Sequence, residues 1–291
     1  MKVGLIDVDG HHFPNIALMK ISAYHKQLGD IVCMYLPLFD NDCDIIYKSK
    51  VFTFTPDITD VFCDNIILGG TGYNLTNTLP KEIDDIYPDY SLYNITNTAY
   101  GYLTRGCPRD CGFCIVTQKE GNKSIQKYKL DQFYRGQKEI KLLDPNITAA
   151  PNCIELINEL SETKAYIDFT QGLDLRLMTN KLIKAIKKCK IKMIHFAWDK
   201  PDDEKIICEN LELFIKESGF DYQKVSVFVL VNYNSTFEED LYRIYKIRDI
   251  GANPYVMIYE KNTAHKNYYK LQRYVNSKYI FRTIKSFEEY K

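Results

Sequence analysis

Three closely spaced cysteines are the residues of this sequence best suited to chemistry. Cys107, Cys111 and Cys114 are separated by three residues and then by two. Thiolates that converge from one short loop are the usual ligands of an iron–sulfur cluster. A four-iron cluster takes four ligands, and this group supplies only three. One iron would therefore stay open to a substrate or a cofactor.

The same spacing allows other interpretations. On a helix the three cysteines would share one face and act as core residues, but the interleaved Pro108, Asp110 and Gly112 favour an irregular loop. A structural zinc site needs four ligands, and the sequence has no second C-x2-C pair and no H-x3-H pair. An electron-transfer cluster would recruit a fourth cysteine from elsewhere in the chain. A non-catalytic iron–sulfur or zinc module therefore stays open as an alternative.

The composition is that of an ordinary globular protein. Lys plus Arg equals Asp plus Glu at 38 each, so no global field attracts nucleic acid or a membrane surface, although a local basic patch would still allow nucleic acid to bind. No apolar run approaches the ~20 residues that span a bilayer, and the first residues do not resemble a signal peptide. We therefore expect a cytoplasmic protein without a membrane partner. Its other cysteines are expected to be reduced thiols rather than a disulfide framework: Cys33, Cys43, Cys63, Cys153, Cys189 and Cys208.

Residues 1–98 have the pattern of a short, doubly wound α/β domain. A helix-compatible stretch covers residues 15–26. Around it lie strand-like apolar runs at residues 3–8, 31–36, 44–54 and 65–68. Strands that alternate with a helix are typical of a Rossmann-like domain, which would be incomplete at this length.

Residues 99–262 repeat a strand-then-helix pattern. The strand-like runs begin between 27 and 39 residues apart, a spacing suitable for βα units; they cover residues 100–105, 139–143, 166–169, 193–197, 225–231 and 254–259. Six units predict a parallel α/β sheet that curves into an open, partial (β/α)6 barrel, because six strands are too few to close comfortably. Residues 263–291 are expected to form a C-terminal helical extension.

Polar residues follow several of these strands at the point where each strand ends. The cysteine loop follows the first strand, residues 144–146 follow the second, and residues 171–176 follow the third. Asp199 follows the fourth strand, and Asn232 follows the fifth. The carboxyl ends of parallel strands meet at one edge of a sheet, so we expect these groups to surround one cavity.

The cysteine loop resembles the signature of the radical SAM superfamily, C-x3-C-x-aromatic-C, with Gly112 and Phe113 in the last two variable positions. The resemblance implies a 4Fe–4S cluster held by Cys107, Cys111 and Cys114, with S-adenosylmethionine (SAM) on the fourth iron. One electron from the cluster would cleave SAM to methionine and a 5′-deoxyadenosyl radical, which abstracts hydrogen from a substrate. The family fold is a partial (β/α)6 barrel, and the electron donor would be a flavodoxin or a ferredoxin. The sequence indicates neither the substrate nor the catalytic residues that act on it.

The resemblance also implies residues that contact the cofactors. Phe113 belongs to the motif itself. Many family members carry Gly-Gly-Glu after the second strand to hold the amino group of SAM, whereas this chain has Asp144-Pro145-Asn146. Asp144 could still accept a hydrogen bond from an ammonium group, and Arg176 could pair with a carboxylate. We predict that Phe113, Asp144, Asn146 and Arg176 bind the cofactors; the alternatives are a loop residue for Asp144 and a surface ion pair for Arg176.

The N-terminal domain resembles modules that bind cobalamin. Residues 100–107 and 119–121 are similar to a radical SAM subgroup that carries such a domain. Cobalamin domains can carry D-x-H-x-x-G after the first strand, with the His as a cobalt ligand; residues 9–14 read Asp-Gly-His-His-Phe-Pro, so Pro14 replaces the glycine. The later glycine turn at residues 69–72 resembles the one that approaches the nucleotide tail. A degenerate cobalamin-type domain is therefore expected, and a cobalamin-dependent radical SAM methyltransferase is a further alternative.

Overall fold

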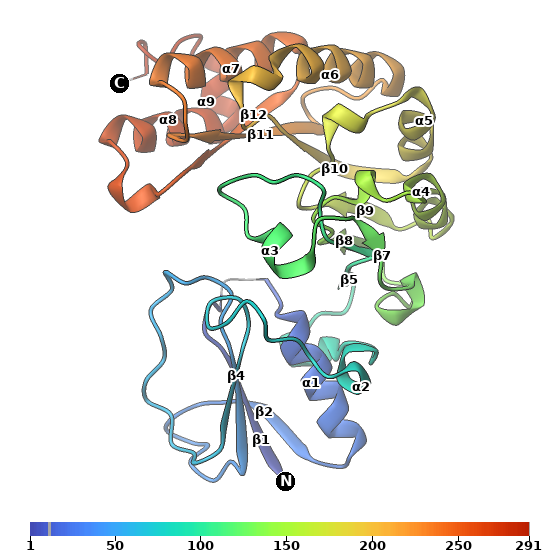
Figure 1. Cartoon of the computed structure of the whole chain (residues 1–291), viewed down its shortest axis with the longest axis vertical. Coiled ribbons are helices and arrows are strands. Elements are labelled where there is room, and N and C mark those ends of the chain that lie inside the picture. The colour runs from blue at the N-terminus through green and yellow to red at the C-terminus, as the bar shows by residue number, and fades with distance from the viewer. Residues whose placement is uncertain (11–12, 291) are drawn as a thin grey trace. The chain divides into compact units, whose positions relative to one another are not determined.

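The computed structural model describes residues 1–10 and 13–290 (Figure 1). The chain divides into two compact units. The first unit comprises Met1–Gly101, Arg109–Asn122 and Tyr128–Ile140, and the second comprises Tyr102–Pro108, Lys123–Lys127 and Lys141–Lys291. Two later segments of the first unit fall in the stretch that the sequence pattern assigns to the barrel.

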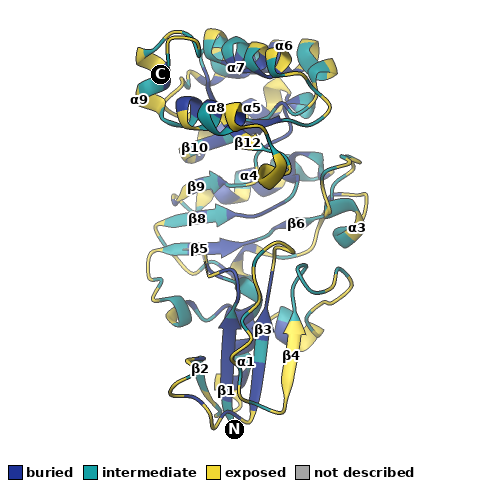
Figure 2. Cartoon of the chain, turned by 90° about the vertical axis from the view of Figure 1, so that its left-hand side faces the viewer, coloured by how far each residue is buried: buried dark blue, intermediate teal, exposed yellow. Residues whose placement is uncertain are grey.

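A four-stranded parallel sheet forms the centre of the first unit. Its strand order is β2-β1-β3-β4; the strands are β1 (Lys2–Asp7), β2 (Ile31–Met34), β3 (Ile45–Ser49) and β4 (Ile66–Gly69). Helix α1 (Ile16–Gln27) connects β1 to β2 and begins at Asn15, whose side chain accepts a hydrogen bond from the Leu18 amide. This arrangement agrees with the expected α/β pattern. In Figure 2, β1 and β3 are largely buried, whereas the edge strand β4 is exposed.

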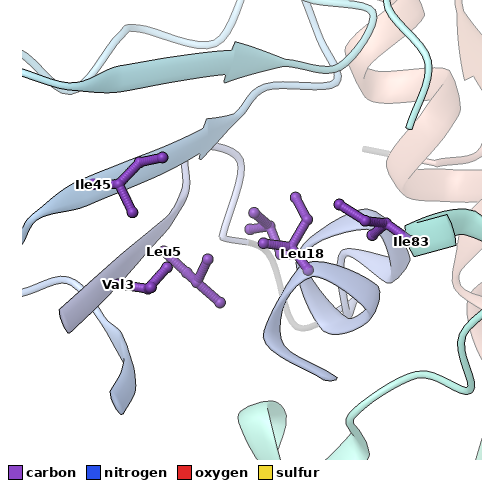
Figure 3. Close-up of a cluster of buried hydrophobic side chains, with 6 residues drawn as sticks. Val3, Leu5, Leu18, Ile45 and Ile83 are labelled. Atoms are coloured by element: carbon purple, nitrogen blue, oxygen red, sulfur yellow. The ribbon is translucent and has the colours of Figure 1, made fainter. Parts of the chain in front are cut away.

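The core of the first unit lies between the sheet and two helices. Leu18 of α1 packs with Val3 and Leu5 of β1, with Ile45 of β3, and with Ile83 of the short helix α2 (Lys81–Asp84) (Figure 3). All five side chains are at most 9% exposed. Apolar burial on this scale is the main driving force for folding of the unit.

A six-stranded sheet has the order β12-β11-β10-β9-β8-β5. Its strands are β5 (Thr98–Gly101), β8 (Glu139–Leu142), β9 (Tyr166–Phe169), β10 (Lys190–Ala197), β11 (Val225–Val231) and β12 (Asn253–Ile258). The pairs β9–β10, β10–β11 and β11–β12 are parallel. All six expected strands are therefore present in an α/β fold. In the described part of the chain, β5 and β12 are the edges of an open sheet rather than neighbours in a closed barrel.

Helices follow the strands of this sheet, as the sequence pattern predicts. They are α4 (Cys153–Glu162), α5 (Asn180–Lys188), α6 (Glu204–Ser218), α7 (Phe237–Ile250), α8 (Lys266–Asn276) and α9 (Lys278–Thr283). Helix α7 begins at Thr236 with a capping box to Glu239 and ends at Gly251, whose φ of 104° suits glycine. The C-terminal extension is helical only as far as Thr283. No helix in residues 1–10 and 13–290 is long and apolar enough to cross a membrane.

The expected strand at residues 100–105 is divided in two. After β5 the chain bends, and β6 (Thr104–Arg105) pairs antiparallel with β7 (Ile125–Gln126). The backbone amides of Leu103 and Thr104 donate to the Asp144 carboxylate instead of to a neighbouring strand. The connection from β6 to β8 contains the short helix α3 (Val116–Glu120). Single turns of 3-10 helix cover Tyr90–Tyr93, Leu130–Gln132, Ile147–Ala149, Leu175–Leu177, Pro201–Asp203 and Lys261–Thr263.

Candidate functional site

The cysteine segment is an irregular loop, as its sequence predicts. Residues 106–115 belong to neither a helix nor a strand, and Gly106 enters the loop with a φ of 85°. All nine cysteines are thiols. The sulfur-bearing residues of the motif are not core residues, since Cys107 and Cys111 are half-buried and Cys114 is exposed. The helical interpretation with three buried thiols is therefore wrong.

Hydrogen bonds within the first unit shape the second half of the loop. The Cys114 amide donates to the Cys111 carbonyl at 2.9 Å, which closes a turn around Gly112 and Phe113. The Thr117 hydroxyl donates to the Arg109 carbonyl at 2.9 Å. These contacts fix the backbone between the second and third cysteines, and they leave Phe113 half-buried.

The thiols suit a metal cluster by their chemistry. In residues 1–10 and 13–290, no three His, Cys, Asp or Glu side chains form a group that could hold a metal ion. The donor set itself is appropriate, because three reduced and accessible thiols in one loop are what iron binding requires. The cluster ligation predicted for Cys107, Cys111 and Cys114 therefore remains a prediction.

Asp144 lies directly after β8 and is only 4% exposed. Its carboxylate accepts hydrogen bonds from the amides of Leu103 (3.1 Å) and Thr104, and from the Thr104 hydroxyl at 2.7 Å. Burial raises the pKa of this carboxyl to about 6, and the hydrogen bonds from Thr104 and Leu103 oppose that rise. Asp144 thus fixes the segment that leads into Cys107. Contact between Asp144 and SAM stays a prediction.

Asn146 lies beside the first cysteine. Its Nδ2 atom is 3.5 Å from the Cys107 Sγ atom and 3.3 Å from Oδ2 of Asp174. Its Oδ1 atom accepts a hydrogen bond from the Thr148 hydroxyl at 2.6 Å. The structure therefore brings together two of the predicted site residues, Cys107 and Asn146, which are far apart in sequence.

Arg176 takes part in two ion pairs. Its Nε donates to Oδ1 of Asp174 at 2.7 Å, and its Nη1 donates to Oδ2 of Asp203 at 3.0 Å. The side chain of Arg176 is 24% exposed. The pair with Asp203 is partly exposed, as the alternative of a surface ion pair expects, whereas the side chain of Asp174 is only 4% exposed. A SAM contact by this guanidinium stays a prediction.

Three residues on one face of the six-stranded sheet were not identified from the sequence. The ring of His195, on β10, stacks on Phe228 of β11 with a centroid distance of 4.9 Å and an interplanar angle of 7°. The Nε2 atom of His195 is 3.7 Å from Oδ1 of Asp168 on β9, and Nδ1 is buried without a hydrogen-bond partner among the described residues. The alternation of side chains along the strand could have indicated His195. Ile194 and Phe196 are buried on one face of the sheet, so His195 between them lies on the opposite face.

Polar residues at the other strand ends were expected to surround a cavity. They form hydrogen bonds with the backbone of the fold instead. Asp199 accepts a hydrogen bond from the Leu230 amide at 3.1 Å, and burial raises the pKa of its carboxyl. Asn232 donates through Nδ2 to the Tyr259 carbonyl at 3.0 Å. Trp198 is 1% exposed and donates to the Lys200 carbonyl, so it is a packing residue.

The cobalamin prediction rests partly on His11 and His12, which lie outside the described residues. Asp9 is buried, and its carboxylate accepts hydrogen bonds from the loop after β3, including the Thr55 hydroxyl at 2.7 Å. Gly70 has a φ of 93°, and a Cβ atom there would lie 2.2 Å from the Lys50 carbonyl oxygen. The close approach of the Lys50 backbone thus explains why a glycine occupies position 70. Cobalamin binding stays a prediction.

The chain was also compared with known proteins. No protein-family model matches it, and no curated protein does.

Proposed function

We propose that this protein is a radical SAM enzyme in which Cys107, Cys111 and Cys114 ligate a 4Fe–4S cluster and SAM occupies the fourth iron. The observation that carries the proposal is the irregular loop itself, with its C-x3-C-x-F-C spacing and three accessible thiols. The open six-stranded α/β sheet supports it, since a partial (β/α)6 barrel needs such a sheet. The proposed enzyme is cytoplasmic and receives electrons from a flavodoxin or a ferredoxin.

When bound, the cluster and SAM supply a 5′-deoxyadenosyl radical that abstracts hydrogen from the substrate. The residues of the chain bind these groups, orient them and limit the access of water. Asp144 holds the backbone of Leu103 and Thr104 in place just before the first ligand. Phe113, Asp144, Asn146 and Arg176 are the proposed cofactor contacts.

Anaerobic reconstitution with iron and sulfide tests the proposal. We expect a brown protein with about four irons per chain that converts SAM to 5′-deoxyadenosine when dithionite is added. Cys111→Ala should lose both the colour and the cleavage, because the cluster would keep only two protein ligands. Cys153→Ala is the matched control, since Cys153 is also half-buried but lies on helix α4.

Three results would count against the proposal. Retention of colour and cleavage by Cys111→Ala would exclude this ligand set. One zinc per chain in place of iron would favour a structural module. S-adenosylhomocysteine as the only product of SAM, without 5′-deoxyadenosine, would count against reductive cleavage; together with stoichiometric cobalamin binding, it would favour the alternative of a cobalamin-dependent radical SAM methyltransferase.

A further inference from the structure

The side-chain amide of Asn146 is held in one orientation. The Thr148 hydroxyl accepts a hydrogen bond from the Asp174 amide at 3.1 Å, and it donates its own proton to Oδ1 of Asn146 at 2.6 Å. The Asp174 carboxylate can only accept hydrogen bonds, so the amide atom 3.3 Å from it is the donor Nδ2, and Oδ1 is the acceptor that faces Thr148. Both N–H groups of Asn146 therefore point the other way, one toward the Cys107 sulfur and one toward the Asp174 carboxylate.

The groups around Asn146 make this arrangement rigid. Asn146 is 4% exposed, and its backbone carbonyl accepts a hydrogen bond from the Ser124 hydroxyl at 2.7 Å. Asp174, 8% exposed, is held on its other oxygen by Nε of Arg176 at 2.7 Å. A buried network in which each member has partners fixes side-chain positions strongly. The N–H directed at Cys107 is thus built into the fold rather than a surface contact.

We infer that Asn146 is a positioning residue that donates an N–H···S hydrogen bond to Cys107 in the cluster-loaded enzyme and raises the reduction potential of the cluster. The inference rests on the proposed function. Reduction adds one electron and makes the cluster and its thiolates more negative. A hydrogen-bond donor fixed on a ligating sulfur stabilises that added charge, and hydrogen bonds to the sulfurs are known to set cluster potentials.

The test is a redox titration of the reconstituted full-length protein without SAM. The spectroscopic signal of the reduced cluster is recorded at each potential. Asn146→Ala should shift the midpoint potential to a more negative value at unchanged iron content. The control is Asn152→Ala, which removes a side-chain amide that bonds Gln126 on the surface, and it should leave the potential unchanged. A role in folding alone would alter iron content but not the potential of the cluster that forms.

Thr148→Val provides a second variant in case Asn146→Ala fails to fold or to load. It keeps Asn146 but removes the hydroxyl that orients the amide, so a smaller shift in the same direction is expected. Equal potentials in loaded wild-type protein and in the loaded variant would overturn this inference and leave the proposed function intact. A wild-type protein that binds no iron would instead refute the proposed function and this inference with it.

Discussion

His195 shows how its surroundings can suppress the charge of a single side chain. Burial is the main cause that lowers its pKa to about 4, and the positive charge of Lys278 adds to the effect. The imidazole is therefore neutral at pH 7, where it presents a flat, uncharged ring stacked on Phe228.

This shift predicts a loss of stability in mild acid. The unfolded chain takes up the His195 proton near pH 6.5, whereas the folded chain takes it up only near pH 4. The free energy of unfolding should therefore fall as the pH decreases from 6.5 to 4, by up to about 3 kcal/mol from this group. Urea unfolding at several pH values measures the effect. The free energy of unfolding of His195→Gln should depend less on pH than that of the wild type. The control is His265→Asn, which replaces an exposed histidine.

The sequence indicated where the candidate site residues lie in the fold, but it did not indicate which groups they contact. The loop conformation of the cysteines followed from Pro108 and Gly112, and the strand-end positions of Asp144 and Asn146 followed from the strand pattern. The contact between Asn146 and Cys107 joins residues 39 positions apart, so no local pattern indicates it. For the same reason, the sequence did not show that the carboxylate of Asp144 is engaged by Leu103 and Thr104.

Helix α7 is joined to the ends of two strands by a buried ion pair. Arg243 donates to the carbonyls of Trp198 and Leu230 and to the carboxylate of Asp240. Asp240 in turn accepts hydrogen bonds from the Asn232 amide at 3.0 Å and from a serine hydroxyl. Both charged side chains are at most 1% exposed, so each depends on the other for compensation of its buried charge.

Removing one member of this pair should therefore be costly. We expect Arg243→Ala to lower the free energy of unfolding by about 3–5 kcal/mol, because it leaves the Asp240 carboxylate buried and uncompensated. Chemical denaturation followed by circular dichroism measures the change. Asp249→Ala removes one member of the Arg248–Asp249 pair, in which Asp249 is 67% exposed, and should cost less than about 1 kcal/mol. Similar losses in the two variants would contradict the role given to the buried pair.

Local signals predicted the helices and strands well wherever no distant side chain intervened. Threonine side chains cap the start of α5 and of α7, and Gly251 ends α7, so local residue types account for these helix ends. The predicted strand at residues 44–54 ends at Ser49, because the Asp9 carboxylate takes the amides of Val51 and Phe52 from the sheet. Asp144 interrupts the predicted strand at residues 100–105 in a similar way. Both errors arise from buried carboxylates that are remote in sequence.

Each of the two compact units has its own buried apolar core. Leu18 is 1% exposed in the core of the first unit, and Leu211 of α6 is 0% exposed in the second. Units with separate cores commonly unfold in separate steps. We therefore predict that calorimetry of the full-length chain resolves two thermal transitions.

Matched substitutions assign these transitions to the units. Leu18→Ala and Leu211→Ala each remove the same buried atoms, and each should cost about 2–5 kcal/mol in its own unit because a cavity remains. Leu18→Ala should lower the midpoint of one transition, and Leu211→Ala should lower the midpoint of the other. If both variants shifted a single shared transition by similar amounts, the two units would have to unfold as one cooperative structure. The stability of the cysteine loop would then depend on both cores, since its residues are divided between the units.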